Sequence, residues 1–200
     1  RAFTDRYLRL VKRFGKIPAM WGALTHAKGD TPVLSDDVVV NVWSTDYSDP
    51  QEMKRLGYKM IIMDDSEVYI VPGAGYYYDY LNCKHLYDNW TPSHLSGGSF
   101  AEDDEQILGG MFAVWNDHVG NGISVADIHH RLFPALQTLS CKMWHAAGTA
   151  LPYAAFARKS KCLSEAPGVN ELGSLRDTLT VGELTPNDAL AKNVCEQAGY

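Results

Sequence analysis

Apolar residues follow two alternating patterns along the chain: short, nearly continuous runs, and longer stretches in which they recur every three or four positions. The continuous runs predict strands buried on both faces, as in a parallel sheet covered by helices. The periodic stretches predict amphipathic helices. In chain order we expect strands at 17–21, 38–43, 58–63 and 108–114, and helices at 3–14, 49–56, 125–145 and 151–163.

Local signals support several of these boundaries. Gly15 follows the first helical stretch, in the position that a left-handed glycine often takes after a helix. Asp49 and Pro50 suit the N-cap and the first position of the second helix. Gly57 should end that helix. The helix boundaries therefore rest on residue types with a known stereochemical role, as well as on periodicity.

Between the third and fourth strands the pattern becomes irregular. Residues 64–67 are mostly acidic, 68–71 return to an extended, apolar character, and 72–106 are aromatic and rich in glycine. Loops of that length in compact domains are usually lids or binding loops. We therefore expect a functional loop with little regular structure at 72–106.

Four strands that alternate with helices make half of a (β/α)₈ barrel, the TIM barrel. The chain has 200 residues, whereas a complete barrel takes about 250. A doubly wound sheet would instead place a glycine fingerprint for phosphate after its first strand, and Gly73-Ala74-Gly75 is too short a match. Half a barrel leaves two open sheet edges, so we expect the missing half, or another copy, to cover them.

The pattern also divides the chain. We expect the half-barrel to occupy 1–150 and an extra helical segment, packed on the barrel, to occupy 151–172. From 173 onward Thr, Gly, Pro and Asn are scattered and periodicity is weak, which indicates a linker or the start of another domain.

Composition excludes several classes of protein. Hydrophobic residues make up 46% of the chain and charged residues 21%, as in a globular domain. A net charge of −6 disfavours binding to nucleic acid, and no run of 18 apolar residues is present that would span a membrane. The four cysteines have no C-x-x-C spacing and the histidines no ligand spacing, so we expect neither a metal nor another cofactor. An even number of cysteines permits disulfides without requiring them.

Three tryptophans, Trp21, Trp43 and Trp115, each stand at or near the C-terminal end of a predicted strand. A single tryptophan there is best explained by core packing. Three in equivalent positions predict an aromatic cup, because the active site of a (β/α)₈ barrel lies at these strand ends. Asp117 follows Trp115 by two residues. A flat ring beside a carboxylate suits a sugar, since the ring packs on the apolar face of the pyranose and the carboxylate accepts from its hydroxyls.

Tyr69 follows the third strand and can point its hydroxyl into the same mouth. Tyr77 with Asp79, in the long loop, competes for that role. The remaining acidic clusters are expected to be solvated loop charges or helix caps, and none makes a convincing catalytic acid pair. They are Asp36-Asp37, Asp64-Asp65 and Asp103-Asp104-Glu105. The sequence contains no G-x-S-x-G motif, which would indicate a serine nucleophile.

Gly110-Met111-Phe112-Ala113-Val114-Trp115-Asn116-Asp117, followed by a helix with Arg131-Leu132-Phe133-Pro134-Ala135-Leu136, resembles the last strand and helix of the family 20 glycoside hydrolases. These are the β-N-acetylhexosaminidases and lacto-N-biosidases. The earlier strands that end in Trp21 and Trp43, and the approach to the third strand through Gly57-Tyr58-Lys59, are similar in order and spacing. The resemblance covers about residues 1–150 and corresponds to the last four strand-helix units of the family's barrel.

The resemblance implies substrate-assisted retaining catalysis, in which the 2-acetamido oxygen of the sugar attacks its own anomeric carbon. A Glu protonates the leaving oxygen, and the neighbouring Asp orients the acetamido nitrogen. It also implies that Trp21, Trp43 and Trp115 wall the acetamido pocket. Tyr69 would hold the acetamido oxygen, and Asp117 would bind sugar hydroxyls.

Two departures from the family pattern bear on these roles. Many members have Tyr-x-Asp where this chain has Tyr69-Ile70-Val71, which keeps Tyr77 with Asp79 as a competitor for Tyr69. Many also have Trp-x-Glu where this chain has Trp115-Asn116-Asp117. The shorter carboxylate leaves extra room, which favours slightly the lacto-N-biosidase-like branch.

The catalytic Asp-Glu pair of the family would precede Arg1, and we expect these 200 residues alone to be inactive. The expected function is part of an exo-acting glycosidase that removes terminal β-linked N-acetylhexosamine or lacto-N-biose. The alternative is a non-catalytic carbohydrate-binding module with a degenerate barrel. Expected partners are N-acetylhexosamine-containing glycans and the upstream half of the barrel, in an extracellular or cell-surface location.

Overall fold

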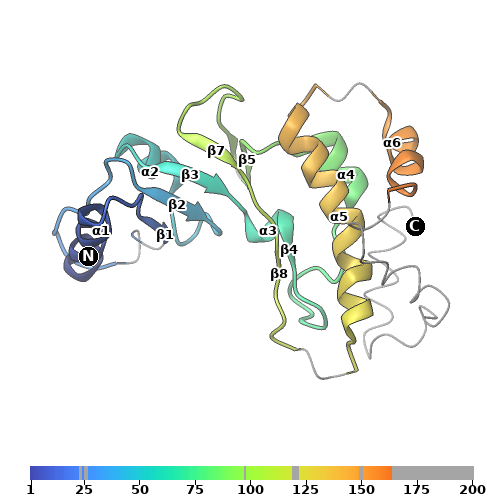
Figure 1. Cartoon of the computed structure of the whole chain (residues 1–200), viewed down its shortest axis with the longest axis horizontal. Helices are drawn as coiled ribbons and strands as arrows, with labels where there is room; N and C mark the ends of the chain where they lie inside the picture. The colour runs from blue at the N-terminus through green and yellow to red at the C-terminus, as the bar shows by residue number, and fades with distance from the viewer. Residues whose placement is uncertain (23, 25–26, 97, 119–121, 149–150, 164–200) are drawn as a thin grey trace. The chain divides into compact units, whose positions relative to one another are not determined.

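The computed structural model describes residues 1–22, 24, 27–96, 98–118, 122–148 and 151–163 (Figure 1). The chain forms two compact units. The first unit comprises Arg1–Val68 and Pro92–Met111, and the second comprises Tyr69–Thr91 and Phe112–Tyr200. The predicted linker or following domain from residue 173 lies outside the described residues, and the boundaries at 150 and 172 stay predictions.

The first unit is built on a parallel sheet of four strands in the order β1-β2-β3-β7. Its strands are β1 (Ala19–Trp21), β2 (Val39–Val42), β3 (Lys59–Ile62) and β7 (Ile107–Gly110). All four fall within or at the margins of the apolar runs that predicted them. Paired residues of parallel strands share a face, so the register gives two rows across the sheet: Met20-Val40-Met60-Ile107 and Trp21-Asn41-Ile61-Gly109.

The two rows of the sheet differ in burial. Val40 and Met60 of the first row are fully buried, in a core that includes Leu8 of α1 (Ala2–Arg13) and Met53 of α2 (Pro50–Arg55). The residues of the second row are half-buried or exposed. One face of the sheet is therefore packed against helices, and the other carries Trp21 in a more open setting.

The short helix α2 forms where its end signals predicted. The Asp49 side chain accepts hydrogen bonds from the backbone N–H groups of Gln51 (3.0 Å) and Glu52 (3.3 Å), and Pro50 opens the helix. These bonds satisfy donors that have no partner within the helix. Gly57, at φ +88°, takes the left-handed conformation that ends it.

The third predicted strand forms as β3, whereas the fourth, at 108–114, is divided between β7 and a further strand. After β3, the turn of α3 (Asp65–Val68) leads into β4 (Tyr69–Ile70). After β7, the chain passes Met111 and Phe112 into β8 (Ala113–Val114). In the second unit β4 and β8 pair in parallel, with Tyr69 opposite Ala113 and Ile70 opposite Val114. The predicted extended segment 68–71 is confirmed in part, because its first residue completes the helical turn.

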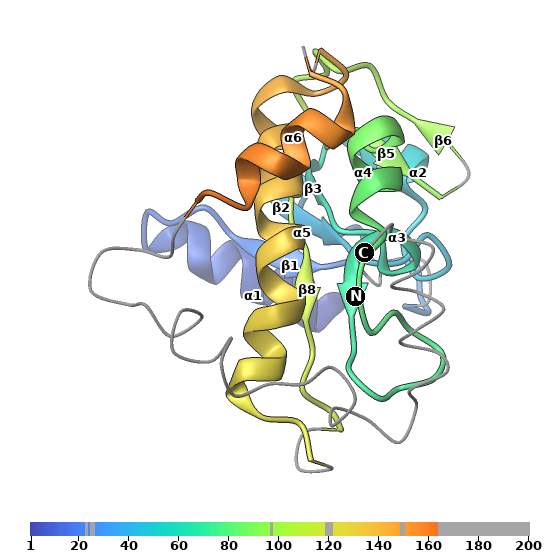
Figure 2. The same ribbon diagram turned by 90° about the vertical axis from the view of Figure 1, so that its right-hand side faces the viewer.

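The described part of the second unit also contains three helices: α4 (Cys83–Asn89), α5 (Val125–His145) and α6 (Tyr153–Ser160). Figures 1 and 2 show α4 beside the long helix α5, and α4 also contacts α6. A capping box begins α5, in which the Ser124 and Asp127 side chains each bond to the other's backbone N–H. The predicted helix 125–145 is confirmed.

The prediction that 72–106 has little regular structure was wrong. This stretch contains α4 and a small antiparallel pair, β5 (His94–Leu95) with β6 (Gly98–Ser99). The Asn82 side chain caps α4 by accepting from the His85 N–H at 2.9 Å. Cys83, Leu86 and Tyr87 supply the helical apolar spacing, which the surrounding glycines and tyrosines obscure in the sequence.

Parallel strands alternating with helices confirm the α/β class. Among the described residues the strands form an open four-stranded sheet, the parallel pair β4–β8 and the antiparallel pair β5–β6, so they do not form a closed barrel. Within the described ranges we also find no helix long and apolar enough to cross a membrane.

Candidate functional site

Two of the three predicted tryptophans lie at one edge of the first unit's sheet. Trp21 is the last residue of β1, and Trp43 directly follows the last residue of β2. Because these strands are parallel and adjacent, their C-terminal ends meet at the same edge. The Trp21 side chain is 46% exposed there, which leaves much of its ring accessible to a ligand.

The indole of Trp43 is held on two sides. Its Nε1 donates a hydrogen bond to the carbonyl oxygen of Gly22, the residue after Trp21, at 3.1 Å. The ring of Tyr47 stacks on it, with ring centroids 4.7 Å apart and planes 26° from parallel. The loops after β1 and β2 are thus joined through Trp43.

Asp64 lies two residues after the last residue of β3 and is buried, with 1% of its surface exposed. Its carboxylate accepts from the Ser66 hydroxyl (2.8 Å) and from the backbone N–H groups of Ser66 and Ser96. Asp64 therefore begins the α3 turn and ties it to the β5–β6 pair. The interpretation of this acidic cluster as a helix cap is confirmed, although Asp64 is buried rather than solvated.

In the second unit the structure brings Tyr69 and Trp115 together. The Trp115 N–H donates to the Ile70 carbonyl at 2.9 Å, which extends the β4–β8 pairing by one step. The Tyr69 and Trp115 rings then lie 5.8 Å apart, tilted by 56°. Tyr69 is only 4% exposed and Trp115 is 37% exposed, so the tyrosine lies beneath a more accessible indole.

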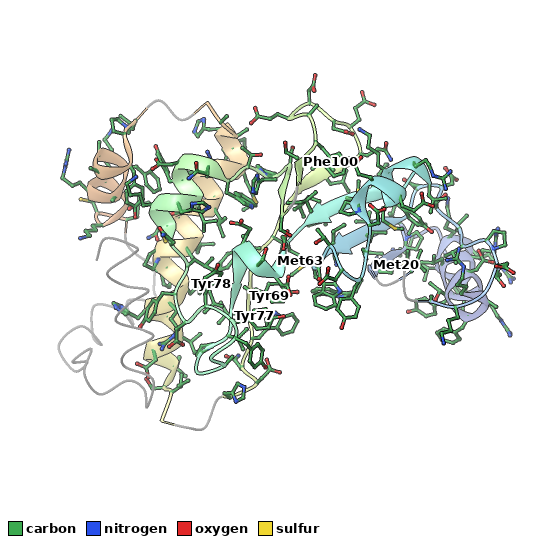
Figure 3. All side chains as sticks on the ribbon, turned by 180° about the vertical axis from the view of Figure 1, so that it is seen from behind. Met20, Met63, Tyr69, Tyr77, Tyr78 and Phe100 are labelled. Carbon is green, nitrogen blue, oxygen red and sulfur yellow. The ribbon has the colours of Figure 1, made fainter. Side chains whose placement is uncertain are left out.

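Tyr77, the competitor of Tyr69, belongs to the same aromatic group. Its ring centroid is 5.7 Å from that of Tyr69 and 5.0 Å from that of Tyr76 (Figure 3). Tyr76 is 74% exposed. Tyr69 and Tyr77 are therefore neighbours in space. Mutation is needed to decide which of them has the predicted role.

Asp79, which was paired with Tyr77 as a candidate, has a different set of contacts. It is 2% exposed, and its Oδ1 accepts from the Gly73 N–H (3.0 Å) and from Nη2 of Arg131 on α5 (3.5 Å). The Arg131 guanidinium also lies over the Tyr80 ring, 4.6 Å from its centroid, and donates to the Asp127 carbonyl. These contacts favour a structural role for Asp79, which holds the 73–79 loop to α5.

Asp117 lies in a turn two residues beyond Trp115, and its side chain is exposed. Its carboxylate is therefore accessible to solvent, as a group that binds sugar hydroxyls requires. The structure thus groups Trp21 with Trp43 in the first unit, and Tyr69 and Trp115 in the second. Convergence of the three tryptophans on one mouth stays a prediction.

Sequence reasoning did not identify the roles of Arg131, Gly22 and Tyr47. A signal for Arg131 exists, because its helical spacing to Ala135, Leu139 and Lys142 places it on the buried face of α5. A charged residue on such a face requires a partner. Gly22 and Tyr47 lie in loops without periodicity, so no comparable signal was present for them. Within the described ranges, no three His, Cys, Asp or Glu side chains are arranged to hold a metal ion.

The structure is similar to solved structures of exo-acting acetylglucosaminidases. A chain from the tandem catalytic modules of the pneumococcal exo-β-D-N-acetylglucosaminidase StrH is 17% identical, with a TM-score of 0.55 over 98% of this chain and 49% of that one. A second StrH structure gives 16% identity and a TM-score of 0.55, covering 99% of this chain and 49% of that one. The exo-β-N-acetylglucosaminidase of Vibrio harveyi, in complex with N-acetylglucosamine, is 17% identical with a TM-score of 0.58, over 80% of this chain and 25% of that one.

The chain therefore spans about half the length of the StrH chains and a quarter of the Vibrio chain. At such low identity these likenesses speak for the fold alone. No curated protein matches the chain. The model of glycosyl hydrolase family 20, catalytic domain, matches residues 1–147. The chain belongs to glycosyl hydrolase family 20.

Proposed function

We propose that the protein containing this chain is an exo-acting glycoside hydrolase that removes terminal β-linked N-acetylhexosamine. The observation that carries the proposal is the contact between Tyr69, the first residue of β4, and Trp115, which follows the parallel strand β8, in a family 20 domain. An acetamido group has an apolar methyl and a carbonyl that accepts hydrogen bonds. An indole and a phenol side by side suit these two parts.

In the proposed reaction the acetamido carbonyl oxygen bonds to the anomeric carbon while the glycosidic bond breaks. A carboxylic acid outside this chain gives its proton to the departing oxygen, and water then opens the cyclic intermediate with retention. The Tyr69 hydroxyl donates to the attacking oxygen and fixes its direction. Trp21, Trp43 and Trp115 enclose the acetamido group and exclude water from it. Asp117 accepts from hydroxyls of the same sugar.

We further propose that the chain supplies the last four strand-helix units of a (β/α)₈ barrel. The second row of the sheet supports this, since Asn41 and Ile61 are half-buried and Trp21 is exposed on a face that parallel sheets normally cover. In a closed barrel that row would face the interior. We also propose that the acid pair lies in the preceding units, so that the 200 residues alone should not hydrolyse a glycoside.

N-acetylglucosamine is the first sugar to test, because the similar StrH and Vibrio harveyi enzymes are named for it. The shorter carboxylate of Asp117 adds lacto-N-biose as the second. A sugar without the acetamido group cannot supply the nucleophile, which provides a matched control substrate.

The test compares a chromogenic N-acetyl-β-glucosaminide with the corresponding β-glucoside, using the protein that contains this chain. Hydrolysis of the acetamido substrate alone supports the proposal. Equal hydrolysis of both substrates would contradict substrate assistance. Binding of N-acetylglucosamine without any hydrolysis would identify a non-catalytic carbohydrate-binding module.

A further inference from the structure

The contacts of Trp43 leave little freedom to its indole. One edge is tied to the Gly22 carbonyl by the Nε1 hydrogen bond of 3.1 Å, and one face is covered by the Tyr47 ring at a centroid distance of 4.7 Å. An indole has two faces on which a ligand can pack. Because Tyr47 takes one of them, only the other remains for a sugar or its acetamido group.

The acceptor of that hydrogen bond is itself fixed by close packing. A Cβ on Gly22 would lie 2.1 Å from the Ser48 hydroxyl oxygen and 2.9 Å from the Ser48 Cβ, so the position admits only glycine. Ser48 is fully buried, and its N–H donates to the Ser44 carbonyl at 3.1 Å. This bond closes the turn that carries Tyr47. The same turn thus packs against Gly22 through Ser48 and against Trp43 through Tyr47.

Core packing does not account for Tyr47. Its side chain is 44% exposed, and it is absent from the buried cluster of the first unit. A ring that exposed contributes less to folding than a core residue does, because much of its apolar surface stays in water. Its ring stacks on the face of Trp43. The geometry therefore relates Tyr47 to the orientation of Trp43 more than to the stability of the fold.

We propose that Tyr47 is a positioning residue, which together with the Gly22 carbonyl clamps Trp43 so that it offers one preset face to the bound sugar. The effect on sugar binding rests on the proposed function, in which Trp43 lines the acetamido pocket. A clamped ring is already ordered before the ligand arrives, so binding does not incur the entropy cost of ordering it. The clamp itself is a property of the first unit and can be tested separately from sugar binding.

The experiment uses the protein that contains this chain, labelled with 5-fluorotryptophan, and records fluorine NMR spectra and the Kd for N-acetylglucosamine. The Trp43 resonance is assigned by its loss in Trp43→Phe. Tyr47→Ala should shift that resonance and raise the Kd about two- to tenfold, the range expected for losing one aromatic pair. Tyr47→Phe keeps the stack and should restore both values to near wild type.

Tyr7→Ala is the matched control, because Tyr7 is another exposed tyrosine of the first unit, 55% exposed and stacked on Phe3. It should change neither the Trp43 resonance nor the Kd. If Tyr47→Ala does not fold, Tyr47→Leu, which retains apolar bulk without a ring, takes its place. Thermal denaturation verifies folding of each variant.

The outcomes separate the clamp from the proposed function. An unchanged Trp43 resonance in Tyr47→Ala overturns the clamp. A shifted resonance with an unchanged Kd overturns the positioning role. A shifted resonance in a protein whose wild type does not bind N-acetylglucosamine supports the clamp and contradicts the proposed function.

Discussion

The contacts that support the candidate residues differ between the two units. In the first unit, Val40, Val42 and Met60 are fully buried beneath α1 and α2, and the ion pairs Lys54–Asp104 and Lys59–Asp37 lie at least partly in solvent. In the second unit, β4 and β8 pair over only two residues each, and the ion pair between Arg131 and Asp79 is buried. Arg131 is 0% exposed and Asp79 3% exposed in their side chains. The apolar core supports Trp21 and Trp43, whereas a polar contact supports the loop beside Tyr69.

This difference determines what each region tolerates. A hydrophobic core loses stability in proportion to the apolar volume removed, and its parts are partly independent. A buried ion pair fails as a unit, because removal of one partner leaves the other charged and desolvated. The second unit should therefore be the more sensitive to a single polar substitution.

The largest expected effect follows from Arg131→Met. This change leaves the Asp79 carboxylate buried without its cation and should lower the free energy of unfolding by about 3–5 kcal/mol. Urea denaturation measures the loss. Arg158→Met, at an exposed arginine of α6, is the matched control and should change stability by less than about 0.5 kcal/mol. A loss below about 1 kcal/mol for Arg131→Met would mean that this pair behaves like a surface pair.

The first unit can be tested with two neighbouring positions of β3. Ile62 is fully buried in the core, so Ile62→Ala should cost about 2–5 kcal/mol of unfolding free energy. Ile61 points to the opposite face of the same strand and is half-buried. If that face lines a closed barrel, Ile61→Ala should also cost about 2 kcal/mol or more. A cost below about 0.5 kcal/mol, typical of a surface position, would contradict the barrel proposal.

Enzyme kinetics can distinguish the roles of Tyr69 and Tyr77, the two candidate tyrosines of the second unit. Tyr69→Phe should lower kcat about 10²-fold and raise KM much less, since its hydroxyl acts on the attacking acetamido oxygen in the transition state. Tyr77→Phe is the matched variant on the adjacent ring and should cost far less. Steady-state kinetics on a chromogenic N-acetylglucosaminide decides the matter. If Tyr69→Phe leaves kcat unchanged and Tyr77→Phe lowers it strongly, the role belongs to Tyr77.

Sequence could predict most of what depends on neighbouring residues. The bounds of α5 follow from its periodicity and from Ser124 and Asp127, which lie three positions apart. The cap of α2 at Asp49 is equally local. The helix α4 was missed although its apolar spacing is also local, because the tyrosines and glycines around it favour a loop.

Contacts between residues that are far apart in the sequence could not be predicted from local patterns. Arg131 and Asp79 are 52 positions apart, and nothing in either segment specifies the pairing. Tyr69 meets Trp115 because β4 pairs with β8 in one register, which depends on the whole fold. The three tryptophans stand at or directly after the ends of β1, β2 and β8, as their positions in the sequence predicted. Their roles and the extracellular or cell-surface location stay predictions.

A smaller effect is expected at Asp117. Asp117→Asn keeps the shape of the side chain but removes the charge and replaces one acceptor by a donor, which should cost about 1.5–3 kcal/mol of sugar binding. The loss should shrink for a substrate that lacks the contacted hydroxyl. Kinetics on N-acetylglucosaminides, N-acetylgalactosaminides and a lacto-N-biose glycoside identifies that hydroxyl. An equal loss on all three would assign Asp117 a structural role.

The smallest expected effect concerns the ion pair of the first unit. Lys54 donates to the Asp104 carboxylate and holds the pKa of Asp104 below its ordinary value. A lowered pKa in the folded state means that the pair stabilises the protein above about pH 4, and that this contribution disappears as the pH falls through the folded pKa. Lys54 is 39% exposed, so solvent screens the pair, and Asp104→Asn should cost less than about 1 kcal/mol at pH 7. Urea denaturation from pH 7 to pH 3 should show wild type and Asp104→Asn converging at the acidic end. A gap that stays constant with pH would show that Asp104 acts through packing and not through its charge.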